Sequence, residues 1–352
     1  MKLLIITGDK SKRLNPHIHY LFDELAHITD LTLWYEPGNI HDILKKIPEN
    51  PDFILINEHG EKNCPKITGL STLTIPYGVY VHDVHYNIKQ RRIEMVKDKV
   101  QYIFSIYRDP FYRWYPAFKQ KMKWLPHHVN PKLYRDYGLK KEIDFLLMGA
   151  VNQQMYPLRC KILKTMKKKP TFVYHPHPGY RDYEEHEKNR YFIGEKYARE
   201  INRAKMFFTC DLSYKYPVKK YYEVLASNTL LLAPASQELK DLGFIPGVHF
   251  VAINEHDFEQ KAEYYLRHEE ERRNIAEQGY RMVHEKHTTA IRARQLVEMI
   301  QDLLVNHKPT EAQSSNVNRR RANSENIHAV GRKRKNLRAK RATVNSRKRR
   351  YK

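Results

Sequence analysis

The stretch YPVKKYYEVLASNTLLLAP, residues 216–234, decides the fold that this sequence predicts. It places Lys220 and Glu223 at the front of a short helix, which leads into a buried apolar strand from Thr229 to Ala233. Side chains three residues apart share one face of a helix. Both would emerge near the edge of a sheet, where open α/β folds bind nucleotides. A lysine there can neutralise a diphosphate, and a glutamate can bind the hydroxyls of a ribose.

Apolar strand patterns alternate with helical patterns on both sides of this stretch. This alternation predicts βαβ units and doubly wound parallel sheets. Three amphipathic helices are expected at the end, over 257–267, 269–286 and 289–304. The expected strands cover residues 2–7, 31–34, 51–60, 73–81, 100–106, 143–151, 171–175, 206–212, 229–233 and 249–253.

Together with ERRNIAEQGYRMVHEKHTTAIRAR (residues 271–294), the opening stretch resembles the C-terminal half of GT-B glycosyltransferases. The nearest group is the CgeB-like, spore-maturation one, of glycosyltransferase family 1-like type. The resemblance covers about residues 1–305 and is strongest over 140–295. It implies an α/β protein of GT-B architecture, in which two Rossmann-like doubly wound domains face a cleft. The expected parts are an acceptor-side domain (1–125), a linker (126–140), a nucleotide-sugar domain (141–288), a terminal helix (289–306) and a disordered basic tail (307–352).

The resemblance also implies a donor site in the second domain. Glu223 would bind the ribose of a nucleotide sugar and Lys220 its phosphates, although arginine is commoner in the family at the lysine position. Gly149 ends an apolar strand before a helix, so backbone amides there could approach the diphosphate. Arg159, in that following helix, could face solvent or the cleft. A plain turn at Gly149 and an exposed ion pair between Lys220 and Glu223 are the alternatives.

Two positions depart from the family pattern. Lys215 stands where the paired EX7E motif has its first glutamate, so no sugar contact is expected from it. Asn228 stands near a usual glycine, and asparagine tolerates the left-handed conformation that such a turn needs. We expect Asn228 to keep the turn beside the donor site. The resemblance implies a UDP-sugar as co-substrate and no separate cofactor.

Nineteen histidines form several short clusters, and one of these suggests a catalytic pair. His82 and Asp83 follow an apolar strand at its carboxyl end, where either could act as general base on an acceptor hydroxyl. Metal ligation is the competing interpretation, but no further ligands occur at a fixed spacing. Loop histidines without a role remain a third. The other clusters are His17/His19, His127-His128 and the HPHPG segment at 175–179.

The aromatic segment YRDPFYRWYPAF (residues 107–118) could stack on acceptor sugars, but packing explains the same residues equally well.

Charge and cysteine content indicate which partners and which compartment to expect. The net charge is +23, and the stretch from His307 to Lys352 contributes +14 of it, with 16 Lys/Arg against two acidic residues. That tail suits a polyanion through counterion release, or is simply solvated. Three dispersed cysteines favour a reducing cytoplasm, and we expect no membrane span. The acceptor, a protein or polysaccharide, stays open. The alternatives are a non-catalytic spore- or surface-assembly protein with a degenerate GT-B body and, less favoured, a metal-dependent hydrolase.

Overall fold

The computed structural model describes residues 1–12, 16–59, 64–179, 181–188 and 190–307. Met1–Gln301 form one compact unit, and a second unit begins at Asp302. The basic tail predicted beyond His307 lies outside the described residues, so its predicted disorder is not addressed by the structure.

Six parallel strands form the first sheet, in the order β2-β1-β4-β6-β7-β8. The order reverses between β1 and β4, and in open α/β sheets ligands bind beyond the carboxyl ends of strands at such a reversal. The strands are β1 (Lys2–Ile6), β2 (Asp30–Trp34), β4 (Phe53–Asn57), β6 (Tyr77–Val81), β7 (Tyr102–Ser105) and β8 (Met122–Trp124). A separate two-stranded sheet pairs β3 (Gly38–Asn39) with β5 (Ile67–Thr68).

Helices cover both sides of the first sheet. The connections from β1 to β2 and from β2 to β4 run in opposite directions along the sheet, so right-handed crossovers put α1 and α2 on opposite faces, as a doubly wound fold requires. β1, β4 and β6 are almost wholly buried, as strands covered on both faces must be. The elements are α1 (His17–Ala26), α2 (Ile40–Lys46), α3 (Ile88–Lys97), α4 (Arg108–Trp114) and the 3₁₀ turns η1 (Leu70–Thr72) and η2 (Pro116–Lys121).

Five parallel strands form the second sheet, in the order β10-β9-β11-β12-β13, which reverses between β9 and β11. Alternate residues of β9 enter two separate cores: Leu146 and Met148 pack with α7, α8 and α11, whereas Phe145 and Leu147 pack with α5 and α10. The strands are β9 (Ile143–Met148), β10 (Phe172–His175), β11 (Ala204–Phe208), β12 (Leu230–Ala233) and β13 (Val251–Ala252). The helices are α5 (Pro157–Met166), α6 (Glu185–Lys188), α7 (Gly194–Asn202), α8 (Lys220–Ala226), α9 (Gln237–Asp241) and α10 (Phe258–Arg267).

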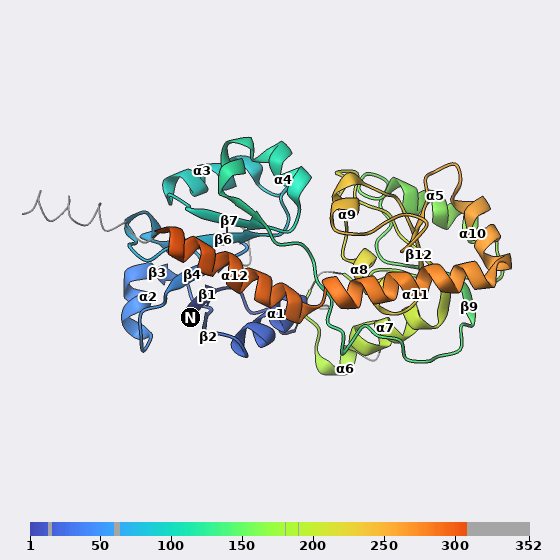
Figure 1. Ribbon diagram of the computed structural model, residues 1–352, viewed down its shortest axis with the longest axis horizontal. Helices are drawn as coiled ribbons and strands as arrows, with labels where there is room; N and C mark the ends of the chain where they lie inside the picture. Colours follow the sequence, from blue (N-terminus) through green and yellow to red (C-terminus); the bar gives the residue numbers. More distant parts are fainter. Residues whose placement is uncertain (13–15, 60–63, 180, 189, 308–352) are drawn as a thin grey trace, which may run out of the picture. The chain divides into compact units, whose positions relative to one another are not determined.

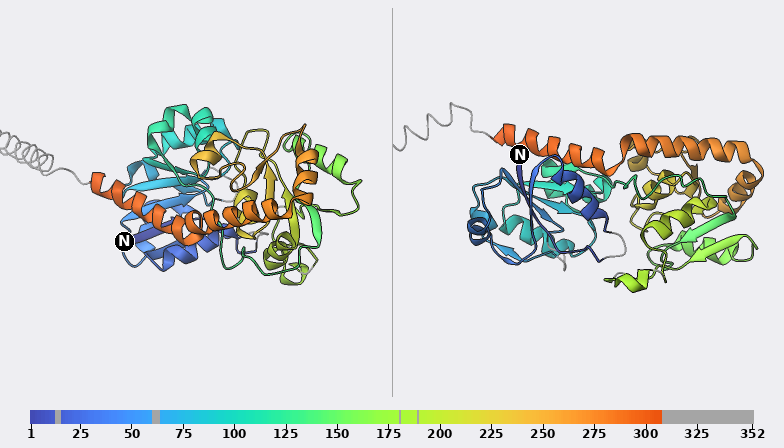
Figure 2. Two further views of the ribbon diagram at one scale, coloured as in Figure 1. Left: turned by 45° about the vertical axis from the view of Figure 1, so that its right-hand side comes forward. Right: turned by 90° about the horizontal axis from the view of Figure 1, so that it is seen from below.

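Two long helices end the described chain, α11 (Glu269–Lys286) and α12 (Thr289–His307). α11 packs along α8, and Figures 1 and 2 both show the two helices side by side. Between α11 and α12 the chain pairs with a distant segment, because Val129 and Thr288 form a parallel bridge.

The fold confirms the predicted α/β, doubly wound, two-sheet architecture. Three strands were not among those expected: β8, which pairs with β7, and the two-residue strands β3 and β5. β8 ends at Trp124, just before the expected linker (126–140). Among the described residues no helix has the length and apolarity that a bilayer crossing demands.

Candidate functional site

Gly149 lies where two cationic side chains approach the backbone. It follows β9 with φ +129, a conformation that L side chains rarely adopt. A Cβ atom there would lie 3.3 Å from Lys220 Cε and 3.5 Å from Arg159 Nη1. The Gly149 amide donates to the His175 carbonyl at 3.0 Å, which fixes the turn. The turn therefore needs glycine for its backbone, and the close approach of Lys220 adds to that need.

Arg159 is buried, only 4% exposed, so the structure excludes the solvent-facing alternative. Its Nη2 donates to Thr209 Oγ1 at 3.1 Å and to the Cys210 carbonyl at 3.3 Å, directly after β11. Its Nη1 donates to the Ala150 carbonyl at 3.2 Å, and its Nε has no hydrogen-bond partner among the described residues. A permanent charge is thus fixed at the order reversal of the second sheet.

Lys220 and Glu223 are linked through a tyrosine. Lys220 Nζ donates to Tyr197 Oη at 3.1 Å, and that hydroxyl donates to Glu223 Oε2 at 3.1 Å. Tyr134 donates to Glu223 Oε1 at 3.3 Å. Glu223 is 3% exposed, so an exposed surface ion pair is excluded. Sequence reasoning missed both tyrosines, which lie 89 and 26 residues from the glutamate.

Burial shapes the charges of this group. It lowers the pKa of Lys220 to about 8, with Glu223 opposing the shift and Arg159 adding to it. It also lowers the pKa of His177, in the loop after β10, to about 4, and the charges of Lys220 and Arg159 lower it further. At neutral pH the group therefore combines two cations with a neutral imidazole.

Asn228 has the predicted left-handed conformation, with φ +51. It lies at the opposite end of α8 from Lys220, where its Nδ2 donates to Asp136 Oδ2 at 2.7 Å and its carbonyl accepts from Lys141 Nζ at 2.8 Å. Its observed contacts hold a turn and do not join the cations around Gly149.

The first sheet has a polar group at its own order reversal. Lys10, after β1, forms an ion pair with Glu58, which follows β4 with φ +58. His82 Nδ1 lies 3.4 Å from Glu58 Oε1, while its Nε2 is buried without a hydrogen-bond partner among the described residues. Burial lowers the pKa of His82 to about 4. The carboxylate that lies close to His82 in space is therefore Glu58. Asp83, which follows His82 in sequence, is exposed.

Three further histidines gather beside His82. The ring centroid of His17 lies 6.0 Å from that of His82, 6.4 Å from His127 and 6.0 Å from His128. Sequence reasoning kept these residues in separate clusters because they come from different segments. Within the described ranges, no group of three or more His, Cys, Asp or Glu is arranged to hold a metal ion.

The aromatic segment 107–118 is largely packed inside the protein. Tyr107 stacks on Tyr216 at 4.2 Å between ring centroids and hydrogen-bonds His127 Nε2 at 3.0 Å. Phe111 and Tyr115 are fully buried. Packing therefore accounts for the buried rings of this segment.

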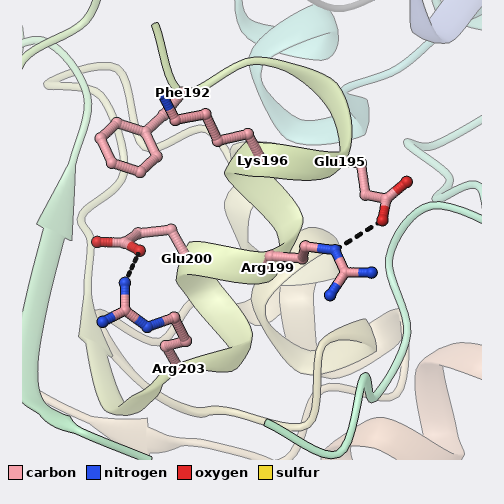
Figure 3. Close-up of a pocket in the computed structure, with 6 residues that line it drawn as sticks. All are labelled: Phe192, Glu195, Lys196, Arg199, Glu200 and Arg203. Carbon is pink, nitrogen blue, oxygen red and sulfur yellow. Dashed lines mark hydrogen bonds and ion pairs between the residues drawn. The ribbon is translucent and has the colours of Figure 1, made fainter. Parts of the chain in front are cut away.

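A separate pocket of about 430 Å³ lies along α7. Figure 3 shows two ion pairs on its wall, Arg199 with Glu195 and Arg203 with Glu200. Phe192 closes it beside His175, at 3.9 Å between ring centroids. None of the predicted site residues lines this pocket, which is formed by Phe192, Glu195, Lys196, Arg199, Glu200 and Arg203.

Residues 154–298 match a glycosyl transferase-like family model. This match contains Arg159, Lys220, Glu223 and Asn228, and begins just after Gly149. The comparison with curated proteins found no match.

Solved glycosyltransferase structures share the fold. A sucrose-phosphate synthase from Thermosynechococcus elongatus superposes with a TM-score of 0.63 at 12% identity, over 86% of this chain and 99% of that one. HepE of Anabaena, in complex with UDP and glucose, superposes with a TM-score of 0.56 at 9% identity, over 86% of this chain and 100% of that one. An alpha-glucosyltransferase in complex with UDP and a 13-mer DNA containing a HMU base has a TM-score of 0.55 at 12% identity, over 85% of this chain and 98% of that one. The architecture is GT-B.

Proposed function

We propose that the protein is a glycosyltransferase that moves a sugar from a UDP-sugar to an acceptor hydroxyl without a metal ion. The observation that carries this proposal is the convergence of Gly149, Arg159 and Lys220 at the order reversal of the second sheet. The glycosyl transferase-like match over 154–298 supports it, as do neighbours whose structures contain UDP or UDP-glucose.

The cations would serve the departing diphosphate. As the acceptor oxygen attacks the anomeric carbon, the bond between that carbon and the diphosphate oxygen breaks, and negative charge grows on the leaving group. Lys220 and Arg159 are held in place before the reaction by Tyr197 and Thr209. Preorganised charges of this kind stabilise a transition state without reorganisation. They can do so here without a metal.

Glu223 would bind the ribose. Its two carboxylate oxygens accept the hydroxyls of Tyr134 and Tyr197, and a carboxylate held in this way suits the hydroxyl pair of a ribose.

The acceptor proton would pass to His82 or Asp83. His82 is paired with Glu58, which would stabilise the imidazolium formed when Nε2 takes the proton. Asp83 is exposed, and could act as the base directly.

Titration calorimetry with UDP-, GDP- and TDP-sugars tests the proposal. A UDP-sugar should bind, and Glu223→Ala should weaken its binding. No binding to any of the sugars would refute the proposal, and an unchanged affinity in Glu223→Ala would refute the assigned ribose contact.

Lys215 supports a second candidate, a non-catalytic assembly protein whose basic tail holds a polyanion. It stands in place of the first glutamate of EX7E, and it is exposed, with its Nζ 3.6 Å from Asp211 Oδ2. Removing residues 308–352 separates the two candidates. A transferase keeps donor turnover after this truncation, whereas an anchored assembly protein loses its salt-sensitive retention on heparin and has no turnover to keep.

A further inference from the structure

Positive charge is concentrated on one segment beside the first sheet. Residues 86–123, which include α3 and α4, contain ten Lys/Arg against three Asp/Glu, a net charge of +7. The whole chain carries +23 and the stretch from His307 to Lys352 carries +14, so the rest of the chain carries only +9. This one segment therefore accounts for most of the net charge outside the basic tail.

The cations of this segment are exposed, whereas its acidic residues are engaged. Arg92, on α3, donates to the Trp114 carbonyl, which brings the end of α4 beside α3. Glu94 accepts a hydrogen bond from a glutamine of its own helix, and Asp98 lies 3.1 Å from His59. The exposed cations that form no ion pair with any described residue include Lys89, Arg92, Lys97, Lys99, Arg113 and Lys119.

Two exposed aliphatic side chains lie among these cations. Ile93 is 52% exposed and Val96 is 68% exposed, the highest values for large apolar side chains in the described part of residues 1–301. Lys89 and Lys97 are four residues from Ile93 on either side, so all four side chains lie on one side of the helix. The outward face of α3 therefore has an apolar centre with cations around it.

The opposite side of α3 is anchored in the protein. Arg91 and Met95 are fully buried, and Arg91 Nη1 donates to the Asp83 carbonyl at 2.8 Å. The helix is thus fixed before any partner binds, and its outward face needs no folding step to be presented.

This combination of groups suits a lipid bilayer with anionic headgroups. Aliphatic side chains can enter the boundary between headgroups and acyl chains, while the long stems of lysine and arginine let their charges reach the lipid phosphates. A nucleic acid would pair with the cations, but its phosphates and sugars would leave Ile93 and Val96 without an apolar partner.

We propose that the outward face of α3, with Ile93 and Val96 at its centre, docks the protein on the surface of a membrane that contains anionic lipids. Nothing in this docking requires a bound nucleotide sugar, so the proposal is independent of the proposed function.

Co-sedimentation of the full chain with phosphatidylglycerol vesicles tests the apolar centre. Ile93→Gln/Val96→Gln should weaken vesicle binding by about 10-fold or more, because two aliphatic side chains no longer leave water. Glutamine is a good helix former, so α3 should persist, and an unchanged midpoint in urea denaturation checks this. The matched control is Ile28→Gln/Ile245→Gln, which removes two exposed isoleucines elsewhere and should bind as wild type does.

The basic tail attracts the same vesicles, but it is identical in all these proteins and does not affect their ratio. Equal binding of wild type and Ile93→Gln/Val96→Gln would assign the binding to the tail and overturn the proposal.

Lys89→Gln/Lys97→Gln tests the cations, since each charge near an anionic surface contributes an attraction that salt screens. This variant should bind phosphatidylglycerol vesicles about 10-fold more weakly at low salt, with a smaller difference at high salt. If wild type bound phosphatidylcholine vesicles as tightly as phosphatidylglycerol vesicles, the assignment to anionic lipid would be wrong.

Discussion

Glu238 holds the start of the helix that begins at Arg108, since its Oε1 accepts the Arg108 amide at 2.8 Å across 130 residues of sequence. Oε2 accepts the Asp109 amide at 3.0 Å, and Arg108 Nη2 pairs with Asp241 at 2.6 Å. Glu238 is 1% exposed, and burial raises its pKa to about 7, although the hydrogen bonds from the two amides act to lower it. A buried carboxylate therefore links α4 to α9.

This glutamate predicts a pH-dependent stability. The folded state binds the proton more tightly than the unfolded state, so the favourable contribution is complete below about pH 4.5 and lost as pH rises to about 7. The loss is about 3 kcal/mol at most. In urea denaturation across this range, Glu238→Gln should flatten the dependence, whereas Glu285→Gln, at an exposed position, should not. An unchanged slope in Glu238→Gln would rule out this assignment.

The lowered pKa of Lys220 predicts that UDP binding weakens as pH rises through about 8, because the ammonium then loses its proton. Lys220→Arg should keep its charge and give a nearly constant affinity from about pH 7 to 9. Calorimetry near pH 8 in two buffers of different ionisation enthalpy should also reveal proton uptake on binding in the wild type only. Equal pH profiles for both proteins would contradict the role of Lys220.

Gly149→Ala should cost UDP affinity about 10-fold or more, because the added methyl crowds Lys220 Cε at 3.3 Å and the φ of +129 strains the backbone by about 1–3 kcal/mol. Gly247→Ala is a matched control, since φ there is +79 but no atom lies within 4 Å of the new Cβ. The control should lose stability and keep UDP affinity. If both variants bind UDP alike, the crowding at Gly149 has no bearing on the site.

Gly279, within α11, should not tolerate alanine. A Cβ there would lie 2.4 Å from the His249 carbonyl oxygen and 2.9 Å from Leu225 Cδ2 in α8. In an exposed helix interior, a change from glycine to alanine stabilises the folded protein by about 1 kcal/mol. At Gly279 we expect the opposite, a destabilisation of about 1–3 kcal/mol, because the new methyl group overpacks the contact. Gly38→Ala, where the nearest atom is 3.9 Å away, should be close to neutral. Urea denaturation of the three proteins decides the matter.

The fold could be predicted largely from the sequence, because strands buried on both faces are continuous apolar runs ending in polar residues. β8 was missed since it has three residues and precedes a proline. Gly149, Arg159, Lys220 and Glu223 came from a local pattern and do lie close together through Tyr197 and the Gly149 turn. Glu58 could have been noticed as a carboxylate at a strand end.

The remainder of the site depends on contacts that no spacing encodes. Tyr134 reaches Glu223 across 89 residues, and the four histidines meet from separate loops.

The bridge between Val129 and Thr288 has a consequence for how the chain is made. Val129 donates to the His287 carbonyl and accepts from the Thr289 amide, each at 3.0 Å, while Arg292 Nη2 donates to the His127 carbonyl at 2.9 Å. These partners leave the ribosome about 160 residues after the segment that needs them, which at about 5–20 residues per second is a delay of about 8–32 seconds. Throughout that interval the histidines at 127 and 128 lack their final neighbours. The contacts around His127 and His128 can therefore be completed only after nearly the whole described chain has been synthesised.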